Sequence, residues 1–149
     1  MTKKSDGYEF RELELSEFDR FAVTHPLNNF VQSMAVASAQ QARGLKTVAL
    51  GLLFDSTVVA AGIFIIRPWR FGLSWCESPK GYLADYTDAH TVDLFTSHLR
   101  QYLASHRVAY LKISPYIADQ ERDATGKPVT GGADNRSITK GLQSAGYIH

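Results

Sequence analysis

Cysteine, net charge and long apolar runs are all scarce in this sequence of 149 residues. The one cysteine, Cys76, excludes an internal disulfide, and with only scattered histidines beside it no closed zinc site of the usual spacing can form. Sixteen basic and fifteen acidic residues leave a formal charge of +1, which is not the basic excess of a dedicated nucleic-acid domain. No Ser-His-Asp, Cys-His or paired-carboxylate set stands at useful spacing, so no catalytic base is evident.

Membrane-spanning and secretory signals are also missing from the sequence pattern. The longest mostly apolar stretch, residues 47–66, is broken by Asp55, Ser56 and Thr57, which predicts two strands and a turn rather than a membrane span. No apolar run follows the lysines near the N-terminus, so we expect no signal peptide. The hydrophobic content of 44% is enough for one packed domain.

Apolar periodicity predicts a mixed α/β (α+β) chain. Strand patterns cover residues 8–13, 47–54, 58–67, 71–76 and 108–114, and a last strand-like pattern begins at Tyr147. Helix patterns begin at Ser16, Ser33, Asp88 and Asp134, and residues 118–133 read as a long loop. This order predicts a mixed sheet with helices on both faces.

The segment "SPKGYLADYTD", residues 78–88, stands between a predicted strand and a predicted helix, where α/β proteins often hold a phosphate. A phosphate cradle needs several free backbone N–H groups and no nearby acids. This segment has one glycine, one proline, and two acids (Asp85 and Asp88) against one cation, Lys80. We therefore expect that this segment does not hold the pyrophosphate of coenzyme A, and that the chain does not bind acetyl-CoA.

Four stretches together resemble a known family. They are "HPLNNFVQS" at residues 25–33, "SPKGYLADY" at 78–86, "LKISPYI" at 111–117 and "GGADNRSITKGLQSAGYIH" at 131–149. Their order and spacing are similar to those of the FemABX enzymes, the peptidoglycan interpeptide-bridge aminoacyltransferases also known as methicillin-resistance factors. The likeness runs from about Tyr8 to His149 and covers only the N-terminal part of such an enzyme.

The resemblance implies a GNAT-like acyltransferase fold. Residues 1–149 would form a single GNAT-like N-terminal subdomain of a longer enzyme, with residues 1–7 disordered. The enzyme would be cytoplasmic, peripheral at the inner membrane face, and engaged in building the cell wall that sets cell shape. It would move an amino acid from aminoacyl-tRNA, its co-substrate, to the stem peptide of a peptidoglycan precursor, without a cofactor.

The resemblance also implies the partners. The precursor would be UDP-MurNAc-pentapeptide or its lipid-linked form, and tRNA would bind the part of the enzyme that lies beyond this chain. We expect this chain alone to transfer nothing, and a homodimer through an uncovered sheet edge is a further expectation. Two alternatives stay open: a complete small N-acetyltransferase of the GNAT type, and a noncatalytic binding module.

Four residues are the candidate substrate contacts: Gln40, Lys80, Gly81 and Tyr116. Lys80 would donate to a phosphate or carboxylate, although its position alone favours a solvated loop lysine, and Gly81 would supply a backbone angle that only glycine adopts cheaply. Gln40 would donate to the precursor or be an ordinary exposed helix residue. Tyr116 would stack or hydrogen-bond in a cleft, or pack as a buried tyrosine.

The sequence departs from the family pattern at three places. The family commonly has Arg-Gly-Pro where this chain has Lys80-Gly81-Tyr82, and Asp-Pro-Tyr where it has Ser114-Pro115-Tyr116. Where some members carry a Trp and then a Lys that touches the precursor, this chain has Val36 and Gln40. For Trp69 and Trp75, packing in the core is favoured over an aromatic wall.

Overall fold

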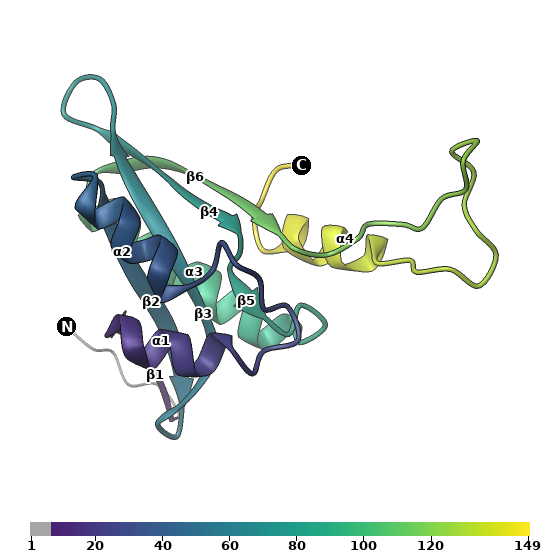
Figure 1. Ribbon diagram of the computed structural model, residues 1–149, viewed down its shortest axis with the longest axis horizontal. Coiled ribbons are helices and arrows are strands. Elements are labelled where there is room, and N and C mark those ends of the chain that lie inside the picture. The colour runs from purple at the N-terminus through teal and green to yellow at the C-terminus, as the bar shows by residue number, and fades with distance from the viewer. Residues whose placement is uncertain (1–6) are drawn as a thin grey trace.

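The strands form one sheet, against which the helices pack, in the computed structural model, which describes residues 7–149. The strands are β1 (Tyr8–Leu13), β2 (Lys46–Phe54), β3 (Thr57–Pro68), β4 (Ser74–Lys80), β5 (Leu83–Ala84) and β6 (Val108–Pro115). The helices are α1 (Leu15–Ala22), α2 (Met34–Ala42), α3 (Ala89–Ser105) and α4 (Arg136–Ser144). Figure 1 shows these elements with their labels.

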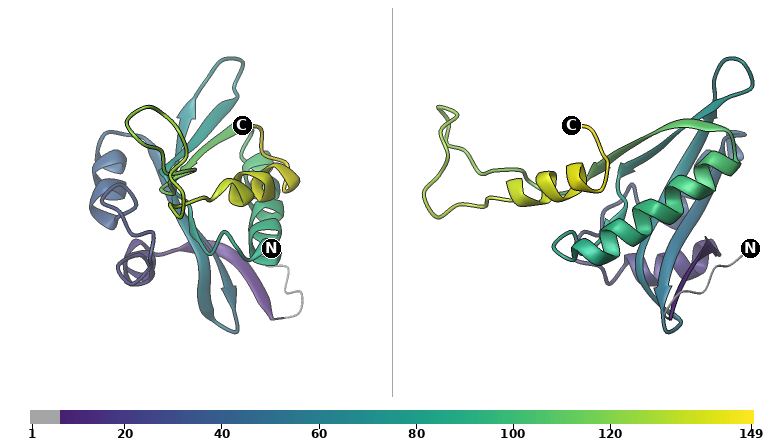
Figure 2. Two further views of the ribbon diagram at one scale, coloured as in Figure 1. Left: turned by 90° about the vertical axis from the view of Figure 1, so that its right-hand side faces the viewer. Right: turned by 180° about the vertical axis from the view of Figure 1, so that it is seen from behind.

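The sheet is mixed and is covered on both faces. Its order is β1-β2-β3-β4-β6, with β5 paired to β3, and only the β4–β6 pair is parallel. Helices α1 and α2 lie on one face, and α3 and α4 lie on the other (Figure 2). The predicted mixed α/β class, with helices on both faces, is therefore confirmed.

Two apolar layers hold the helices to the sheet. The layer under α3 contains Leu50, Phe64 and Phe95, and the layer under α1 and α2 contains Phe18 and Ile63. Each of these five side chains is at most 1% exposed. Strands β2 and β3 are therefore apolar on both faces, which explains why their sequences are continuous hydrophobic runs rather than alternating ones.

Helix starts were predicted with mixed success. Ser33 caps α2 and Asp88 caps α3, since each side chain accepts a hydrogen bond from the backbone three residues on. The predicted cap at Ser16 is wrong, because α1 begins after Glu14 and has no side-chain cap. The predicted cap at Asp134 is also wrong, because Asn135 holds that position in α4.

The segment at residues 78–88 differs most from its prediction as a turn. The strand expected at residues 71–76 is shifted and becomes β4, which runs on to Lys80 because its second half pairs with the parallel neighbour β6. A two-residue strand, β5, follows where a turn was expected. The predicted strand at Tyr147 is not formed; this residue lies in an irregular tail.

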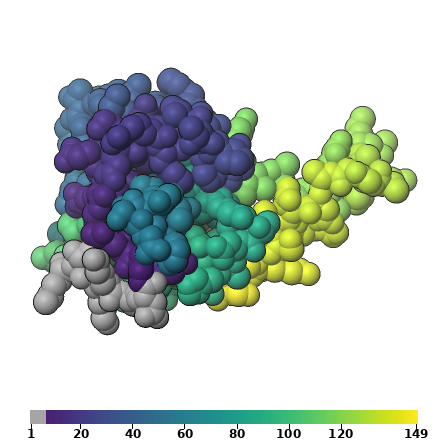
Figure 3. Space-filling view, turned by 90° about the horizontal axis from the view of Figure 1, so that it is seen from below, coloured from purple at the N-terminus to yellow at the C-terminus, as the bar shows by residue number. Residues whose placement is uncertain are grey.

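Residues 118–135 form an arm that extends from the body of the molecule (Figure 3), and α4 at its base packs Ile138 and Leu142 against the layer under α3. Helix α4 has no buried residue. The long loop before it, residues 118–133, is held by two isolated bridges, Gln120↔Asp134 and Arg122↔Pro128. The expected disorder of residues 1–7 falls outside the described residues except at Gly7, whose carbonyl accepts a hydrogen bond from the Asp55 amide at 3.1 Å.

No helix among residues 7–149 is long and apolar enough to cross a membrane. Cys76 is buried within the sheet, as predicted. Burial raises the pKa of its thiol to about 12, so it has almost no thiolate to react at neutral pH. Trp69 corrects another prediction: it is 45% exposed and lies outside the core.

Candidate functional site

Strand β4 separates from β3 halfway along its length, and the space between them is bridged by one side chain. The pairing of β3 with β4 covers Ile65 to Pro68 and stops there, and β5 rejoins β3 only at Ala61 and Ala60. The amide of Gln32 fills the interval. Gln32 is fully buried, so it is enclosed between the two diverging strands.

All three hydrogen bonds of the Gln32 amide connect these strands. Its Oε1 accepts from the Ile63 amide at 2.8 Å, and its Nε2 donates to the Pro79 carbonyl at 2.9 Å and to Ser78 Oγ at 3.3 Å. Gln32 therefore replaces the missing ladder bonds of β3 and β4. It also fixes the loop at residues 27–33 against the end of β4.

Lys80 is held from two sides at this end of β4. Its amide donates to Ser114 Oγ at 3.1 Å, and its carbonyl accepts from Asn29 Nδ2 at 2.9 Å. The residue has a left-handed backbone, with φ of +55°. Because the backbone is fixed by two segments distant in sequence, the exposed side chain starts from a defined position.

The side chain of Lys80 lies over an aromatic ring. Its Nζ is 5.2 Å from the ring centroid of Tyr116, within the range of a cation–π contact. The Tyr116 side chain is 56% exposed, so it is not the buried tyrosine that was considered as the alternative. An ammonium group and an aromatic face are thus presented together to solvent at the carboxyl ends of β4 and β6.

Gly81 has a different role from the one its sequence position suggested. The left-handed backbone is at Lys80, not at Gly81. A Cβ at Gly81 would lie 2.5 Å from Cδ and Nε2 of Gln32. Glycine is needed here because the buried Gln32 amide packs directly on this backbone.

Gln40 does not lie with the other three predicted residues. It stands near the C-terminal end of α2, where the next residue, Gln41, donates to the Thr47 carbonyl at the start of β2. The start of β2 pairs with the end of β3, and the end of β3 pairs with the start of β4. Lys80 is at the other end of β4, so Gln40 and Lys80 lie at opposite ends of the sheet. Gln40 is half-buried, and its buried Oε1 has no hydrogen-bond partner among residues 7–149, so it is not an exposed helix glutamine. A ligand contact by Gln40 stays a prediction.

Sequence reasoning missed the residues that support Lys80, namely Asn29, Gln32 and Ser114. A signal was present, because Asn29 and Gln32 stand in the "HPLNNFVQS" stretch with amide groups that can donate and accept at once. Their partners, 31 to 51 residues away, could not be read from the chain.

The acids near Lys80 are engaged elsewhere. Asp85 accepts from Thr87, Asp88 caps α3 through Thr91, and Glu77 is paired with Arg67 at 2.7 Å. Hydrogen bonds from Thr91 lower the pKa of Asp88, so its carboxylate stays ionised and bound. The Lys80 ammonium therefore has no carboxylate within ion-pair distance among residues 7–149, and it is suited to an anionic ligand.

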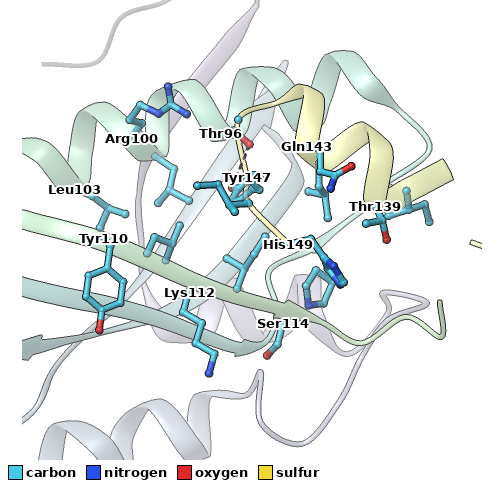
Figure 4. A pocket seen from close by; sticks show the side chains of 18 of the residues that line it. Thr96, Arg100, Leu103, Tyr110, Lys112, Ser114, Thr139, Gln143, Tyr147 and His149 are labelled. Carbon is cyan, nitrogen blue, oxygen red and sulfur yellow. Dashed lines mark hydrogen bonds between the residues drawn. The ribbon is translucent and has the colours of Figure 1, made fainter. Parts of the chain in front are cut away.

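A separate cavity of about 940 Å³ opens on the other face of the sheet. Its apolar walls come from α3, β6 and α4, and include Leu99, Leu103, Leu111, Ile113, Ile138 and Leu142. Thr96 and Tyr147 also line it and are in direct contact, with Thr96 Oγ1 donating to the Tyr147 hydroxyl at 3.2 Å. Figure 4 shows Tyr110, Lys112 and Ser114 projecting from the opposite side of β6. Since Ser114 supports Lys80, the cavity and the Lys80 site lie on opposite faces of this strand.

The groups gathered at the Lys80 site are ones that can bind a ligand. The site offers one cation, one exposed aromatic ring and backbone held by amides, but no nucleophile paired with a base. No group of three or more metal-binding side chains occurs among the described residues. Recognition of an anionic group by Lys80 and Tyr116 stays a prediction, with which the geometry is compatible.

Comparison with known proteins gives relatives that are much longer than this chain. Aminoacyltransferase FemA of Staphylococcus aureus (strain bovine RF122 / ET3-1) is 28% identical over 141 residues, which are 94% of this chain and 33% of FemA. Aminoacyltransferase FemB of Staphylococcus epidermidis is 30% identical over 142 residues, again 94% of this chain and 33% of that protein. The chain thus spans about a third of the length of these relatives.

The fold and the family agree with these relatives. The crystal structure of FemX superposes with a TM-score of 0.76 over 95% of this chain and 32% of FemX, at 17% identity, which shows a shared fold. Residues 13–149 match the model of the FemAB family. The resemblance seen in the sequence is confirmed: the chain belongs to the FemAB family.

Proposed function

We propose that this chain is the precursor-binding part of a FemAB-type aminoacyltransferase. The full enzyme would transfer an amino acid from aminoacyl-tRNA to the stem peptide of a peptidoglycan precursor, as part of cell-wall bridge synthesis. The named relatives are aminoacyltransferases, and they match 94% of this chain. The alternative of a noncatalytic module would keep the same ligand and lose only the transfer.

The observation that carries the proposal is the placement of Lys80 over Tyr116 at 5.2 Å. A peptidoglycan precursor, whether UDP-MurNAc-pentapeptide or its lipid-linked form, carries phosphates and carboxylates. An exposed ammonium can donate to either group, and the Tyr116 ring beside it can stack on a sugar or a base. Asn29 and Ser114 would keep the ammonium in place while the ligand binds.

The transfer itself needs groups outside this site. The acceptor amine would form a bond to the ester carbonyl carbon of aminoacyl-tRNA and pass through a tetrahedral oxyanion. The ester C–O bond then breaks, the ribose hydroxyl leaves, and the proton of the amine passes through a base to the leaving oxygen. Because the Lys80 site has no such base, we expect no transfer by these 149 residues alone. The remaining length of the enzyme would supply the base and the tRNA surface.

Two further expectations belong to the proposal. The enzyme would work in the cytoplasm at the inner face of the membrane, where the lipid-linked precursor is presented. It would also not bind acetyl-CoA. The segment before α3 consists of strand β4 and a carboxylate, Asp88, that caps the helix, so it has no row of free N–H groups for a pyrophosphate.

NMR shift mapping with UDP-MurNAc-pentapeptide tests the proposal. We expect backbone shifts at Asn29, Lys80, Gly81, Ser114 and Tyr116, and their loss in Lys80→Asn; a shift at Gln40 as well would bear out its predicted ligand contact. The matched control is Lys127→Asn, since Lys127 is equally exposed but lies in the arm. Shifts on the α3 face only, or none at millimolar ligand, would remove the site. Calorimetry with acetyl-CoA completes the test, because micromolar binding would instead favour a complete acetyltransferase.

A further inference from the structure

The loop between β3 and β4 presents large aromatic side chains to solvent. Figure 1 shows this loop projecting past the end of the sheet. Phe71, at its apex, is 87% exposed, and Trp69 is 45% exposed. Phe71 has a left-handed backbone, with φ of +58°, followed by Gly72 at +67°. A bulky residue is uncommon in that conformation, where asparagine or glycine would be cheaper, so the sequence places an aromatic ring in water at a backbone cost.

The aromatic side chains of this end form a supported group. Tyr110 of β6 contacts Trp69 edge-on, with ring centroids 5.7 Å apart, and stacks on Trp75 at the same distance. Arg70 lies 5.0 Å over the Trp69 ring. These contacts fix the base of the loop, while the exposed Phe71 ring can insert into an apolar environment outside the protein.

Cations surround the loop and acids do not. Three segments meet at this end of the sheet, residues 42–47, 66–76 and 103–111, and none contains an acidic residue. They supply Arg43, Lys46, Arg67, Arg70 and Arg107. Lys46 is paired with Ile66 in the sheet, and the Arg107 guanidinium lies against Gly72, so both are close to the loop. Among residues 7–149 only Arg67 of these five has a carboxylate partner, Glu77.

The formal charge of the whole chain is +1, so this cationic end is a local excess. An exposed apolar apex next to cationic side chains matches the two layers of an anionic bilayer surface, in which the acyl boundary lies below the charged headgroups. The cavity beside α3 borders Tyr110 but none of residues 69–73, so it does not open at the apex.

We propose that the loop at residues 68–73 is a membrane-contact element that inserts Phe71 and Trp69 into the surface of an anionic lipid bilayer, with Arg70, Arg107 and Lys46 on the headgroups. The inference deepens the proposed function. It rests on that function only for the identity of the membrane, which would be the one that presents the lipid-linked precursor. The Lys80 site lies at the other end of β4, so membrane contact at the loop leaves it uncovered.

Vesicle co-sedimentation of the 149-residue chain tests the inference. We expect binding to vesicles of phosphatidylcholine mixed with phosphatidylglycerol, weak binding to phosphatidylcholine alone, and a decrease with added salt. Each of Arg70→Gln and Arg107→Gln should lower the partition coefficient about fivefold. Phe71→Asn, which suits the left-handed backbone, should lower it about tenfold.

The controls are matched in exposure and lie elsewhere. Phe30 is 80% exposed, so Phe30→Asn removes a comparable ring, and Lys127→Gln removes a comparable cation. Neither should change the partition coefficient. Equal loss in the controls, no preference for anionic vesicles, or binding only to a single-stranded RNA oligonucleotide would overturn the inference. Precursor binding at Lys80 is measured without vesicles, so failure of either idea can be distinguished.

Discussion

The Gln32 side chain accepts a hydrogen bond from the Ile63 amide at 2.8 Å, at the point where β3 loses its neighbour β4. One amide therefore closes a gap in the sheet and, through Pro79, sets the direction in which β4 leaves. The support of Lys80 depends on that direction, because the strand end carries it towards Ser114.

Gln32→Ala should destabilise the fold. It leaves the Ile63 amide and the Pro79 carbonyl without partners, and each unsatisfied buried group costs about 1–3 kcal/mol. We expect a loss of about 2–4 kcal/mol in the free energy of unfolding, measured by urea denaturation. Gln143→Ala is the control, since Gln143 is exposed and should change stability by less than about 0.5 kcal/mol. A loss of that small size in Gln32→Ala would contradict the bridging role.

Gly81→Ala should be destabilising through the same contact. The added Cβ would lie 2.5 Å from the Gln32 amide, which is buried and cannot move aside, and overpacking of this kind costs about 1–3 kcal/mol. Gly141 in α4 has nothing within 4 Å of an added Cβ, so Gly141→Ala should cost nothing and gain up to about 1 kcal/mol of helix propensity. Equal unfolding midpoints in urea for the two variants would disprove the close-packing explanation.

The apolar runs of β2 and β3 and the capped pattern of α3 were sufficient to predict the centre of the fold. These elements are specified locally, by continuous hydrophobicity and by the Asp88 cap. The end of β4 was not predictable in the same way, because Ser78 to Lys80 extend only through parallel pairing with β6, more than 30 residues later. A three-residue segment is too short to show an alternating pattern of apolar residues, so pairing of that kind cannot be predicted from it.

The candidate site was predicted in part for a related reason. Lys80 and Tyr116 follow predicted strands, so their meeting at one edge of the sheet could be anticipated. The need for glycine at position 81 comes from Gln32, which is 49 residues earlier in the chain and packs on its backbone. Gln40 lies about two turns into α2, the helix that follows Gln32, and the length of that helix carries it away from the site.

Asp88 should stabilise α3 in a pH-dependent way. Its pKa is lowered by hydrogen bonds from Thr91, so its contribution is present above the unfolded pKa of about 3.9 and is lost as pH falls through the lower folded value. Asp88→Ala should cost about 0.5–2 kcal/mol at pH 7, and the difference from the native chain should shrink below about pH 3.

Two variants separate the cap from the charge in the same urea experiments. Asp88→Asn retains an oxygen acceptor and should lose less stability than Asp88→Ala, with little pH dependence of its own. Asp93→Ala changes an exposed acid further along α3 and should leave the free energy of unfolding nearly unchanged. A difference between Asp88→Ala and the native chain that stays constant from pH 7 to pH 2.5 would rule out the titrating cap.

Lys80→Asn should weaken precursor binding without affecting the fold. Asparagine tolerates the left-handed backbone, and the amide and carbonyl that bond Ser114 and Asn29 are unchanged, so we expect the same unfolding midpoint. Losing a hydrogen bond from a charged donor costs about 1.5–3 kcal/mol, so the Kd for UDP-MurNAc-pentapeptide should rise at least about tenfold in a fluorescence or calorimetric titration. Lys80→Arg keeps the charge and should remain within a few-fold of the native Kd, with binding weakened by salt in both. If Lys80→Asn binds as tightly as the native chain, the ammonium over Tyr116 is a surface contact and the precursor lies elsewhere.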